Sequence, residues 1–138
     1  MTTCKKESTK VILDSNALFV PLQFKIDVFK EITRLLNRNV EFVLLSPVKH
    51  ELELLGKKDS PKIRKNAQYA LKLAEKCTFA NVNSEEGLHI DDIILKVAKD
   101  WNSPVFTNDM NLRKRLRDIS VPVIYVRQKS RLEIDGLI

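Results

Sequence analysis

The stretch Lys10-Val-Ile-Leu-Asp14 decides the fold. It is a short aliphatic run that ends in a carboxylate, which is typical of a buried strand stopping at the edge of a parallel sheet. An unpaired carboxylate is costly to bury, so an acid at the end of such a strand indicates a partner or a site. The sequence therefore predicts a parallel α/β sheet with Asp14 at its carboxyl edge.

Four further apolar runs predict strands, and the periodic or capped segments between them predict helices. The additional strands are expected over residues 41–46, 77–82, 104–107 and 121–126. The helices are expected over 24–39, 46–55, 59–74, 89–101 and 109–117. Ser46 is expected to cap the second of these helices, Ser60 the third, and Gly56 is expected to end the second. This alternation predicts a three-layer α/β/α fold around a central, mostly parallel five-stranded sheet.

The length of 138 residues suits a single domain over 1–138, with flexible ends over 1–9 and 129–138. Cys4 and Cys77 lack the spacing of a disulfide framework or a zinc site, and Cys77 is expected to be a buried strand residue. Trp101 falls at helical spacing and is expected in the core. Because no apolar run approaches 18 residues and no leader pattern opens the sequence, we expect a cytoplasmic protein without a membrane partner.

The formal net charge of +6 favours polyanionic partners. Residues 57–76 carry seven basic residues against two acids, and residues 113–117 carry four basic residues in five positions. These runs are either solvated helix faces or a surface that binds the phosphates of RNA. The candidate RNA-binding residues are Lys57, Lys58, Lys62, Arg64, Lys65, Arg113 and Arg115.

Acidic residues from separate segments fall where an open parallel sheet binds its ligands, beyond the carboxyl ends of the strands. Asp14 ends the first strand, Asp109 follows the fourth, and Glu51 lies on the helix after the second. Asp91 and Asp92 open the helix before the fourth strand. These acids could converge on one crevice.

Each acid also has a simpler interpretation. Asp91, Asp92 and Asp109 stand at helix starts, where acids cap free N–H groups and favour the positive end of the helix dipole. Glu51 and Glu53 could be solvent-facing, and because they are two residues apart at most one of them can face the crevice.

Convergence of the acids would require a cation, since two unit charges about 4 Å apart repel by about 4 kcal/mol at an effective dielectric of about 20. Oxygen ligands without thiols suit one or two Mg²⁺ or Mn²⁺ ions, which can activate water for phosphodiester hydrolysis. The three glycines exclude a phosphate-binding loop, and two histidines are too few for a zinc site. His89 is expected to be an exposed residue at a helix start, and Ser15 and Ser46 lack a histidine partner for a nucleophilic triad.

Four motifs in order resemble those of the PIN-domain nucleases and span almost the whole chain. They are Val11-Ile-Leu-Asp-Ser-Asn-Ala-Leu18, His50-Glu-Leu-Glu-Leu-Leu-Gly56, Asp91-Asp-Ile-Ile-Leu-Lys-Val-Ala98 and Phe106-Thr-Asn-Asp109. The resemblance places the family's catalytic and metal-binding acids on Asp14, Glu51, Asp91 and Asp109, with Asp91 favoured over Asp92 because it stands seven residues before a small residue. It implies that Asn16, Thr107, Asn108 and the spare Asp92 position these acids.

The resemblance implies a metal-dependent endoribonuclease that leaves 3′-hydroxyl and 5′-phosphate ends, usually as a homodimer. The sequence looks most like archaeal relatives of the eukaryotic small-subunit pre-rRNA cleavage nuclease, which implies RNA as substrate and a ribosome-assembly partner. A PIN domain of this size also resembles the toxins of toxin–antitoxin pairs, which implies an antitoxin partner. Two alternatives stay open: a catalytically idle RNA-binding or scaffold module, and a flap-type DNA nuclease.

Overall fold

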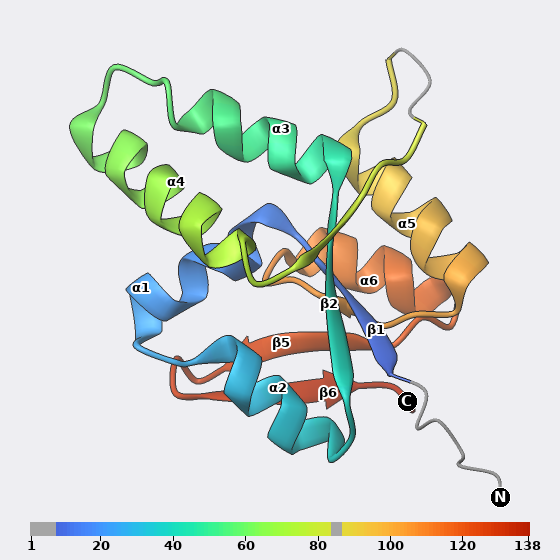
Figure 1. Ribbon diagram of the computed structural model, residues 1–138. Coiled ribbons are helices and arrows are strands. Elements are labelled where there is room, and N and C mark those ends of the chain that lie inside the picture. Colours follow the sequence, from blue (N-terminus) through green and yellow to red (C-terminus); the bar gives the residue numbers. More distant parts are fainter. Residues whose placement is uncertain (1–7, 84–86) are drawn as a thin grey trace, which may run out of the picture.

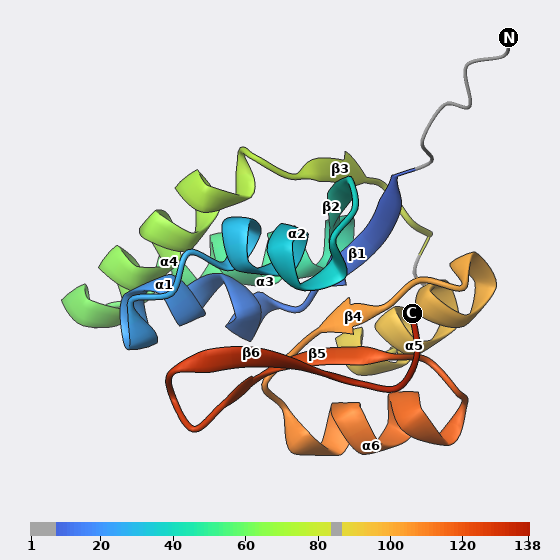
Figure 2. The ribbon, with the colours of Figure 1, turned by 90° about the horizontal axis from the view of Figure 1, so that it is seen from below.

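The computed structural model describes residues 8–83 and 87–138, which form one mixed sheet with helices on both faces (Figures 1 and 2). The sheet has six strands in the order β3-β2-β1-β4-β5-β6. Neighbouring strands are parallel except for β5 and β6, which pair antiparallel. The strands are β1 Thr9–Leu13, β2 Val40–Leu45, β3 Thr78–Ala80, β4 Val105–Phe106, β5 Val123–Arg127 and β6 Arg131–Asp135. The predicted α/β class and mostly parallel sheet are confirmed.

The helices connect the strands and form the outer layers. They are the 3₁₀ helix η1 Ser15–Phe19, α1 Val20–Phe24, α2 Val28–Leu36, α3 Ser46–Leu55, α4 Pro61–Ala74, α5 Ile90–Trp101 and α6 Met110–Asp118. Helix α2 packs against β2 and β6 on one face, whereas α6 packs against β5 on the other, beside α5 (Figure 2). Helices α3 and α4 lie side by side as a pair (Figure 1).

The apolar runs of the sequence form the centre of the core. Val11, Ile12 and Leu13 of β1 are completely buried, because β1 lies between β2 and β4 and is covered on both faces. Helix α5 buries Ile94 and Ala98 on the same stripe, as the helical spacing predicts. The sheet therefore ends in a rigid edge, at which the residues after β1, β2 and β4 are brought together.

Local capping explains most helix boundaries. The Oγ of Ser60 accepts a hydrogen bond from the N–H of Ile63, which confirms Ser60 as the cap of α4. Ser46 does not cap α3, and this expectation is wrong. Ser46 is itself helical, and its hydroxyl instead exchanges hydrogen bonds with the backbone of Val82, which ties α3 to the segment after β3.

The helix expected over 24–39 is shorter and is preceded by two helical segments that the sequence pattern did not predict. Lys25 adopts a left-handed conformation and ends α1, and the Asp27 carboxylate then caps α2 by accepting from the N–H of Lys30. Asn37, also left-handed, ends α2. Phe24 therefore belongs to α1 rather than to the apolar stripe of α2.

The expectations of a five-stranded sheet and of a flexible end over 129–138 are wrong in the same place, because this segment contains β6. The β5–β6 turn uses Gln128 and Lys129, with φ of 53° and 57°. Two consecutive positive φ values are typical of a tight hairpin turn, where Asn-Gly is the usual sequence signal. Without glycine in the turn, the alternation around the buried Leu132 was the only signal of a strand.

Two smaller expectations also need correction. Cys77 precedes β3 and is half-buried rather than a buried strand residue, and burial raises the pKa of its thiol to about 11. Trp101, at the end of α5, is 37% exposed and lies outside the core, with the Lys10 ammonium over its ring. Across the residues that the structure describes, no helix has the length and apolar character needed to cross a bilayer.

Candidate active site

A pocket of about 640 Å³ opens at the carboxyl edge of the parallel strands and contains all five acids singled out in the sequence. We call it the carboxylate pocket, and its polar lining consists of Asp14, Ser15, Asn16, Glu51, His89, Asp91, Asp92, Asp109 and Arg115. These side chains come from the ends of β1 and β4 and from η1, α3, α5 and α6. The convergence expected from the sequence is therefore present in the structure.

Asp14 lies deepest among these acids, with only 5% of its surface exposed. Its Oδ1 accepts a hydrogen bond of 2.7 Å from the N–H of Ser15. Its Oδ2 accepts one of 2.7 Å from the Thr107 hydroxyl and one of 3.2 Å from the Asn16 amide. A buried carboxylate is stabilised only by such partners, so the three donors fix the orientation of Asp14.

Asn16, Thr107 and Asn108 join the ends of three strands into one network. The N–H of Asn108 donates to the Asn16 side-chain oxygen over 3.0 Å, while the Asn108 side-chain oxygen accepts from the N–H of Val126 over 3.0 Å. The hydroxyl oxygen of the completely buried Thr107 accepts from the N–H of Asp109 over 3.1 Å. These hydrogen bonds connect the ends of β1, β4 and β5, and they are contacts through which the three residues could position the acids.

Asp109 caps α6 and also lines the pocket. Its Oδ1 accepts hydrogen bonds from the N–H groups of Asn111 and Leu112, at 2.9 and 3.2 Å. The simpler interpretation of Asp109 as a helix cap is therefore correct, and both capping bonds fall on the same oxygen. The two capping bonds therefore fix the orientation of the Asp109 carboxylate.

The geometry separates the members of both neighbouring acid pairs. Glu51 lines the carboxylate pocket, whereas Glu53 is exposed outside it, as their spacing on α3 requires. Asp91 and Asp92 both line the pocket, but Asp92 forms an ion pair of 2.5 Å with Arg115 of α6. Because its charge is already compensated by Arg115, Asp92 is the less available of the two for a ligand.

The pKa shifts follow from burial and from the crowding of negative charge. Burial raises the pKa of Asp14, and Asp91 and Asp109 raise it further against the lowering effect of the Thr107 hydrogen bond. Burial followed by the charge of Asp14 raises the pKa of Glu51, and burial followed by Asp109 raises that of Asp91. The hydrogen bond from Arg115 lowers the pKa of Asp92. A cation bound beside Asp14, Glu51 and Asp91 would favour their charged forms and so lower these raised pKa values.

The donor chemistry of the carboxylate pocket fits a hard divalent cation. Its ligands are carboxylate oxygens, with one imidazole and no thiol among the described lining residues. In the described part of the chain, however, no three His, Cys, Asp or Glu side chains stand close enough to form a ready-made metal cluster. Mg²⁺ does not require one, because it usually keeps several waters and binds through one or two carboxylates together with substrate phosphate.

The candidate RNA-binding residues fall into two groups. Lys57, Lys58, Lys62, Arg64 and Lys65 are all exposed on the α3–α4 connection and the start of α4. Helix α3 runs away from the sheet edge toward this connection (Figure 1), and none of these residues is among the described residues that line the carboxylate pocket. The structure therefore does not bring this group to the acids.

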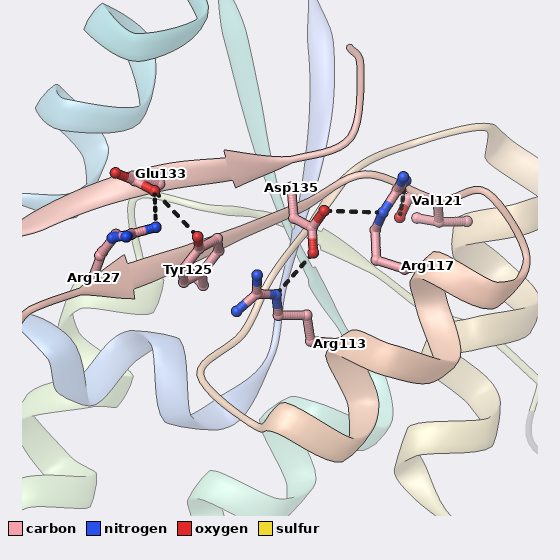
Figure 3. Close-up of polar contacts among 7 residues, drawn as sticks. All are labelled: Arg113, Arg117, Val121, Tyr125, Arg127, Glu133 and Asp135. Carbon is pink, nitrogen blue, oxygen red and sulfur yellow. Dashed lines mark hydrogen bonds and ion pairs between the residues drawn. The ribbon is translucent and has the colours of Figure 1, made fainter.

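The second group, on α6, is already paired with acids. Arg115 bonds to Asp92, and the Nε of Arg113 donates to the Asp135 carboxylate of β6 over 3.0 Å. The Nε of Arg117 also pairs with Oδ1 of Asp135 over 3.2 Å, so Asp135 joins α6 to the last strand (Figure 3). Arg113 therefore contacts the last strand, whereas Arg115 contacts the start of α5.

Sequence reasoning assigned no role to two residues of the carboxylate pocket and overlooked a second pocket. Ser15 lines the carboxylate pocket beside Asp14, and His89, exposed as expected, lines it from the start of α5. The second pocket is lined by residues from α1, from the start of α6 with the two residues after β4, and from the β5–β6 hairpin. Its residues come from three separate segments of the chain, so no single local motif could have identified it.

Comparison with known proteins places this arrangement in a family. Residues 11–129 match the family described as "PIN like domain". The chain is 37% identical over 130 residues to ribonuclease VapC4 of Methanocaldococcus jannaschii, covering 94% of this chain and 98% of that protein. It is 27% identical over 127 residues to ribonuclease VapC9 of Archaeoglobus fulgidus, covering 91% of this chain and 89% of that protein.

A solved structure of similar shape gives the same result. The structure described as that of the PIN domain endonuclease Utp24 superimposes with a TM-score of 0.77 at 28% identity, over 94% of this chain and 92% of the other. The sequence match, the identity to VapC4 and the shared fold agree. This chain belongs to the PIN-domain family.

Proposed function

We propose that the protein is a divalent-metal-dependent endoribonuclease whose active site is the carboxylate pocket. The observation that carries the proposal is the gathering of Asp14, Glu51, Asp91 and Asp109 from four separate elements at one sheet edge. Such a concentration of negative charge destabilises the fold unless it serves a ligand. The names of the curated relatives, both ribonucleases, support the same activity.

The four acids are proposed to hold Mg²⁺ or Mn²⁺, as one or two ions. When bound there, such an ion would supply activation of a water molecule and stabilisation of the leaving oxygen of a phosphodiester. Asp14 and Asp109 are the proposed direct ligands, because their hydrogen-bond partners fix each carboxylate. Glu51 and Asp91 would either bind the ion or orient a water in the pocket.

The neighbouring polar residues are proposed to keep the acids in place. Thr107 and Asn16 hold Asp14 through their contacts with Oδ2, and Asn108 fixes the segment that carries Asp109. Asp92 would act indirectly, by holding Arg115 at the rim where the substrate's phosphates pass. Mutation of residues that hold ligands in this way usually lowers metal affinity or activity by about 10- to 100-fold.

The biological role is proposed to be either rRNA processing or action as a toxin-type ribonuclease. The likeness to Utp24 favours the first role, and the identity to VapC proteins favours the second, in which an antitoxin would be the partner. Induced expression of the protein in a host, beside its Asp14→Asn variant, would separate them. A toxin arrests growth only in the form with an intact site, whereas a processing enzyme leaves growth unchanged.

The proposed activity is tested by incubating the protein with labelled single-stranded RNA and matched DNA in Mg²⁺, Mn²⁺ or EDTA. Internal cleavage of RNA that EDTA abolishes is the expected result, with 3′-hydroxyl and 5′-phosphate ends. RNA binding without cleavage in any metal would favour the idle RNA-binding module instead. Preferential cutting of DNA would favour the flap-type nuclease. Light scattering of the same sample would test the expected homodimer.

A further inference from the structure

We propose that a second pocket, next to the carboxylate pocket, binds one nucleotide of the RNA strand beside the bond that is cut. We call it the basic pocket, and its lining includes Phe24, Met110, Arg113, Tyr125, Arg127 and Lys129. This inference rests on the proposed endoribonuclease function and adds the position of the substrate strand. It places the RNA path on α6 and the β5–β6 hairpin rather than on α4.

The two pockets have opposite charge. The basic pocket has a volume of about 590 Å³ and is lined by Arg113, Arg127 and Lys129, with no Asp or Glu among its described lining residues. Asp135 and Glu133 pair with Arg113 and Arg127 from outside this lining, and the group of five side chains keeps a net positive charge through Lys129. The carboxylate pocket next to it contains five acids. A polyanion is repelled by the acids unless a cation is present, whereas the basic pocket attracts it directly. A strand held in the basic pocket is thus anchored beside the acids.

The basic pocket also offers a flat surface for a base. The Arg113 guanidinium lies 3.7 Å from the centre of the Tyr125 ring, and Tyr125 is fixed by its hydroxyl bond to Glu133. Asp135 holds the Nε of Arg113, so the guanidinium plane is kept in place while the side chain stays 30% exposed (Figure 3). Unpaired bases stack on guanidinium planes and aromatic rings, and the 66% exposed Met110 adds an apolar wall.

The pockets are separated by only one short segment of chain. Thr107 and Asn108 line the basic pocket, whereas Asp109, the next residue, lines the carboxylate pocket. The Thr107 hydroxyl itself reaches across to donate to Asp14 over 2.7 Å. A single strand with one phosphate at the acids therefore has its adjoining nucleotide at the basic pocket. Gln128 and Lys129 of the β5–β6 turn, which lies near α1 in both views (Figures 1 and 2), complete the lining of the basic pocket.

The test measures binding of labelled oligouridylate by fluorescence anisotropy at several salt concentrations, in an Asp14→Asn background that keeps the RNA intact. One variant combines Arg127→Gln with Lys129→Gln. Its matched control combines Lys30→Gln with Lys99→Gln, which removes the same charge from exposed positions on α2 and α5. A third protein carries Arg113→Lys, which keeps the charge but loses the guanidinium plane.

The double pocket variant is expected to bind RNA at least about tenfold more weakly than the control. The slope of the logarithm of its affinity against the logarithm of the salt concentration is expected to be smaller by about 1.4, since each phosphate contact contributes about 0.7 to that slope for single strands. Arg113→Lys is expected to weaken binding about fivefold or more with an unchanged salt dependence, because stacking is lost without charge. Equal affinity and salt dependence in the double variant and its control would overturn the proposal. Binding of a labelled polyglutamate peptide is measured with the same proteins. If the pocket variants lost peptide binding while their RNA binding stayed unchanged, the proposal would also be overturned, in favour of an acidic protein partner.

The failure of this inference can be distinguished from failure of the proposed function. Metal-dependent cleavage is measured separately on the protein with Asp14 intact. Cleavage by that protein together with unchanged RNA binding in the pocket variants would reject the basic pocket and retain the nuclease. If the pocket variants lost RNA binding while the protein with Asp14 intact showed no cleavage, the basic pocket would be retained and the nuclease function rejected.

Discussion

The hydroxyl of Thr107 donates a hydrogen bond of 2.7 Å to Oδ2 of Asp14, although the two residues are 93 positions apart in the chain. Both side chains are buried at the junction of β1 and β4, and Asn16 donates to the same oxygen. The orientation of the deepest acid in the carboxylate pocket therefore depends on a neutral residue from another strand.

Replacement of Thr107 by valine should impair both stability and cleavage. Thr107→Val keeps the shape of a completely buried side chain but removes the donor, so Asp14 is left with fewer partners. The free energy of unfolding is expected to fall by about 1–3 kcal/mol, the cost of leaving a buried polar group unsatisfied. Cleavage is expected to slow by about 10- to 100-fold. Urea denaturation and single-turnover kinetics provide the two measurements.

Thr107→Ser is the matched control for this change, since it retains the hydroxyl. It should stay close to the parent in cleavage rate. A valine variant that cuts as fast as the serine variant would show that Thr107 does not position Asp14.

Stability of the metal-free protein should fall as the pH rises. The pKa values of Asp14, Glu51 and Asp91 are raised above their ordinary values of 3.8, 4.5 and 3.8, so these acids bind protons more tightly in the folded than in the unfolded chain. Their contribution to stability is present below those ordinary values and is lost as pH rises through the raised ones. In EDTA, thermal unfolding is expected at a lower temperature at neutral pH than at a pH near the ordinary pKa values of these acids.

Added Mg²⁺ or Mn²⁺ should reverse this trend, because the metal binds the ionised acids. The metal-induced rise in unfolding temperature should be larger at the higher pH, and it should shrink in Asp14→Asn. Asp92 and Glu133 have pKa values lowered from their ordinary 3.8 and 4.5. Their contribution to stability is therefore lost as the pH falls below those ordinary values, which is the opposite of the trend for the three raised acids. An equal metal effect at both pH values would argue against binding to the raised acids.

The neighbouring Asp91 and Asp92 should respond differently to the same substitution. Asp92 is engaged by Arg115, so Asp92→Asn is expected to slow cleavage by no more than the roughly 10- to 100-fold typical of a residue that acts through another group. Asp91→Asn is expected to cost more than that range, because Asp91 is the proposed ligand. Single-turnover rates at saturating metal make the comparison. A larger loss in Asp92→Asn than in Asp91→Asn would reverse their assigned roles.

The junction after β6 should tolerate only glycine. Gly136 has a φ of +105°, and an added Cβ would stand 2.9 Å from the Arg117 guanidinium carbon. Arg117 cannot move freely, because it is paired with Asp135. Gly136→Ala is expected to lower the free energy of unfolding by about 1–3 kcal/mol.

Gly56→Ala is the control for Gly136→Ala, because Gly56 has a helical φ of −67° and an added Cβ would meet ordinary contacts. It should leave stability unchanged or slightly raised. If urea denaturation gave equal stability for both variants, the special conformation of Gly136 would be disproved.

The sequence was sufficient for the layers of the fold because each pattern reported a local property. The aliphatic run before Asp14 predicted a buried parallel strand, and Ser60 before Pro61 predicted the start of α4, since burial and capping act within a few residues. The strand β6 was missed because its turn reaches positive φ at Gln128 and Lys129 without glycine. Pairing with β5, rather than a local preference, stabilises that turn.

The candidate site shows the same division between local and distant information. The positions of the four acids relative to their strands could be predicted, because parallel strands bring their carboxyl ends to one edge. The pairing of Arg115 with Asp92 and of Arg113 with Asp135 could not, since these contacts join α6 to segments more than 20 residues away. The sequence therefore indicated basic charge but not whether that charge was free to bind RNA.

The most direct test compares the parent with Asp14→Asn, using single-turnover cleavage of labelled single-stranded RNA and calorimetric titration of Mn²⁺. Circular dichroism first confirms that the variant is folded. We expect the parent to bind Mn²⁺ and cut RNA in a metal-dependent manner, and the folded variant to lose both properties. A folded Asp14→Asn variant that cuts RNA as fast as the parent would contradict the assignment of the carboxylate pocket as the active site.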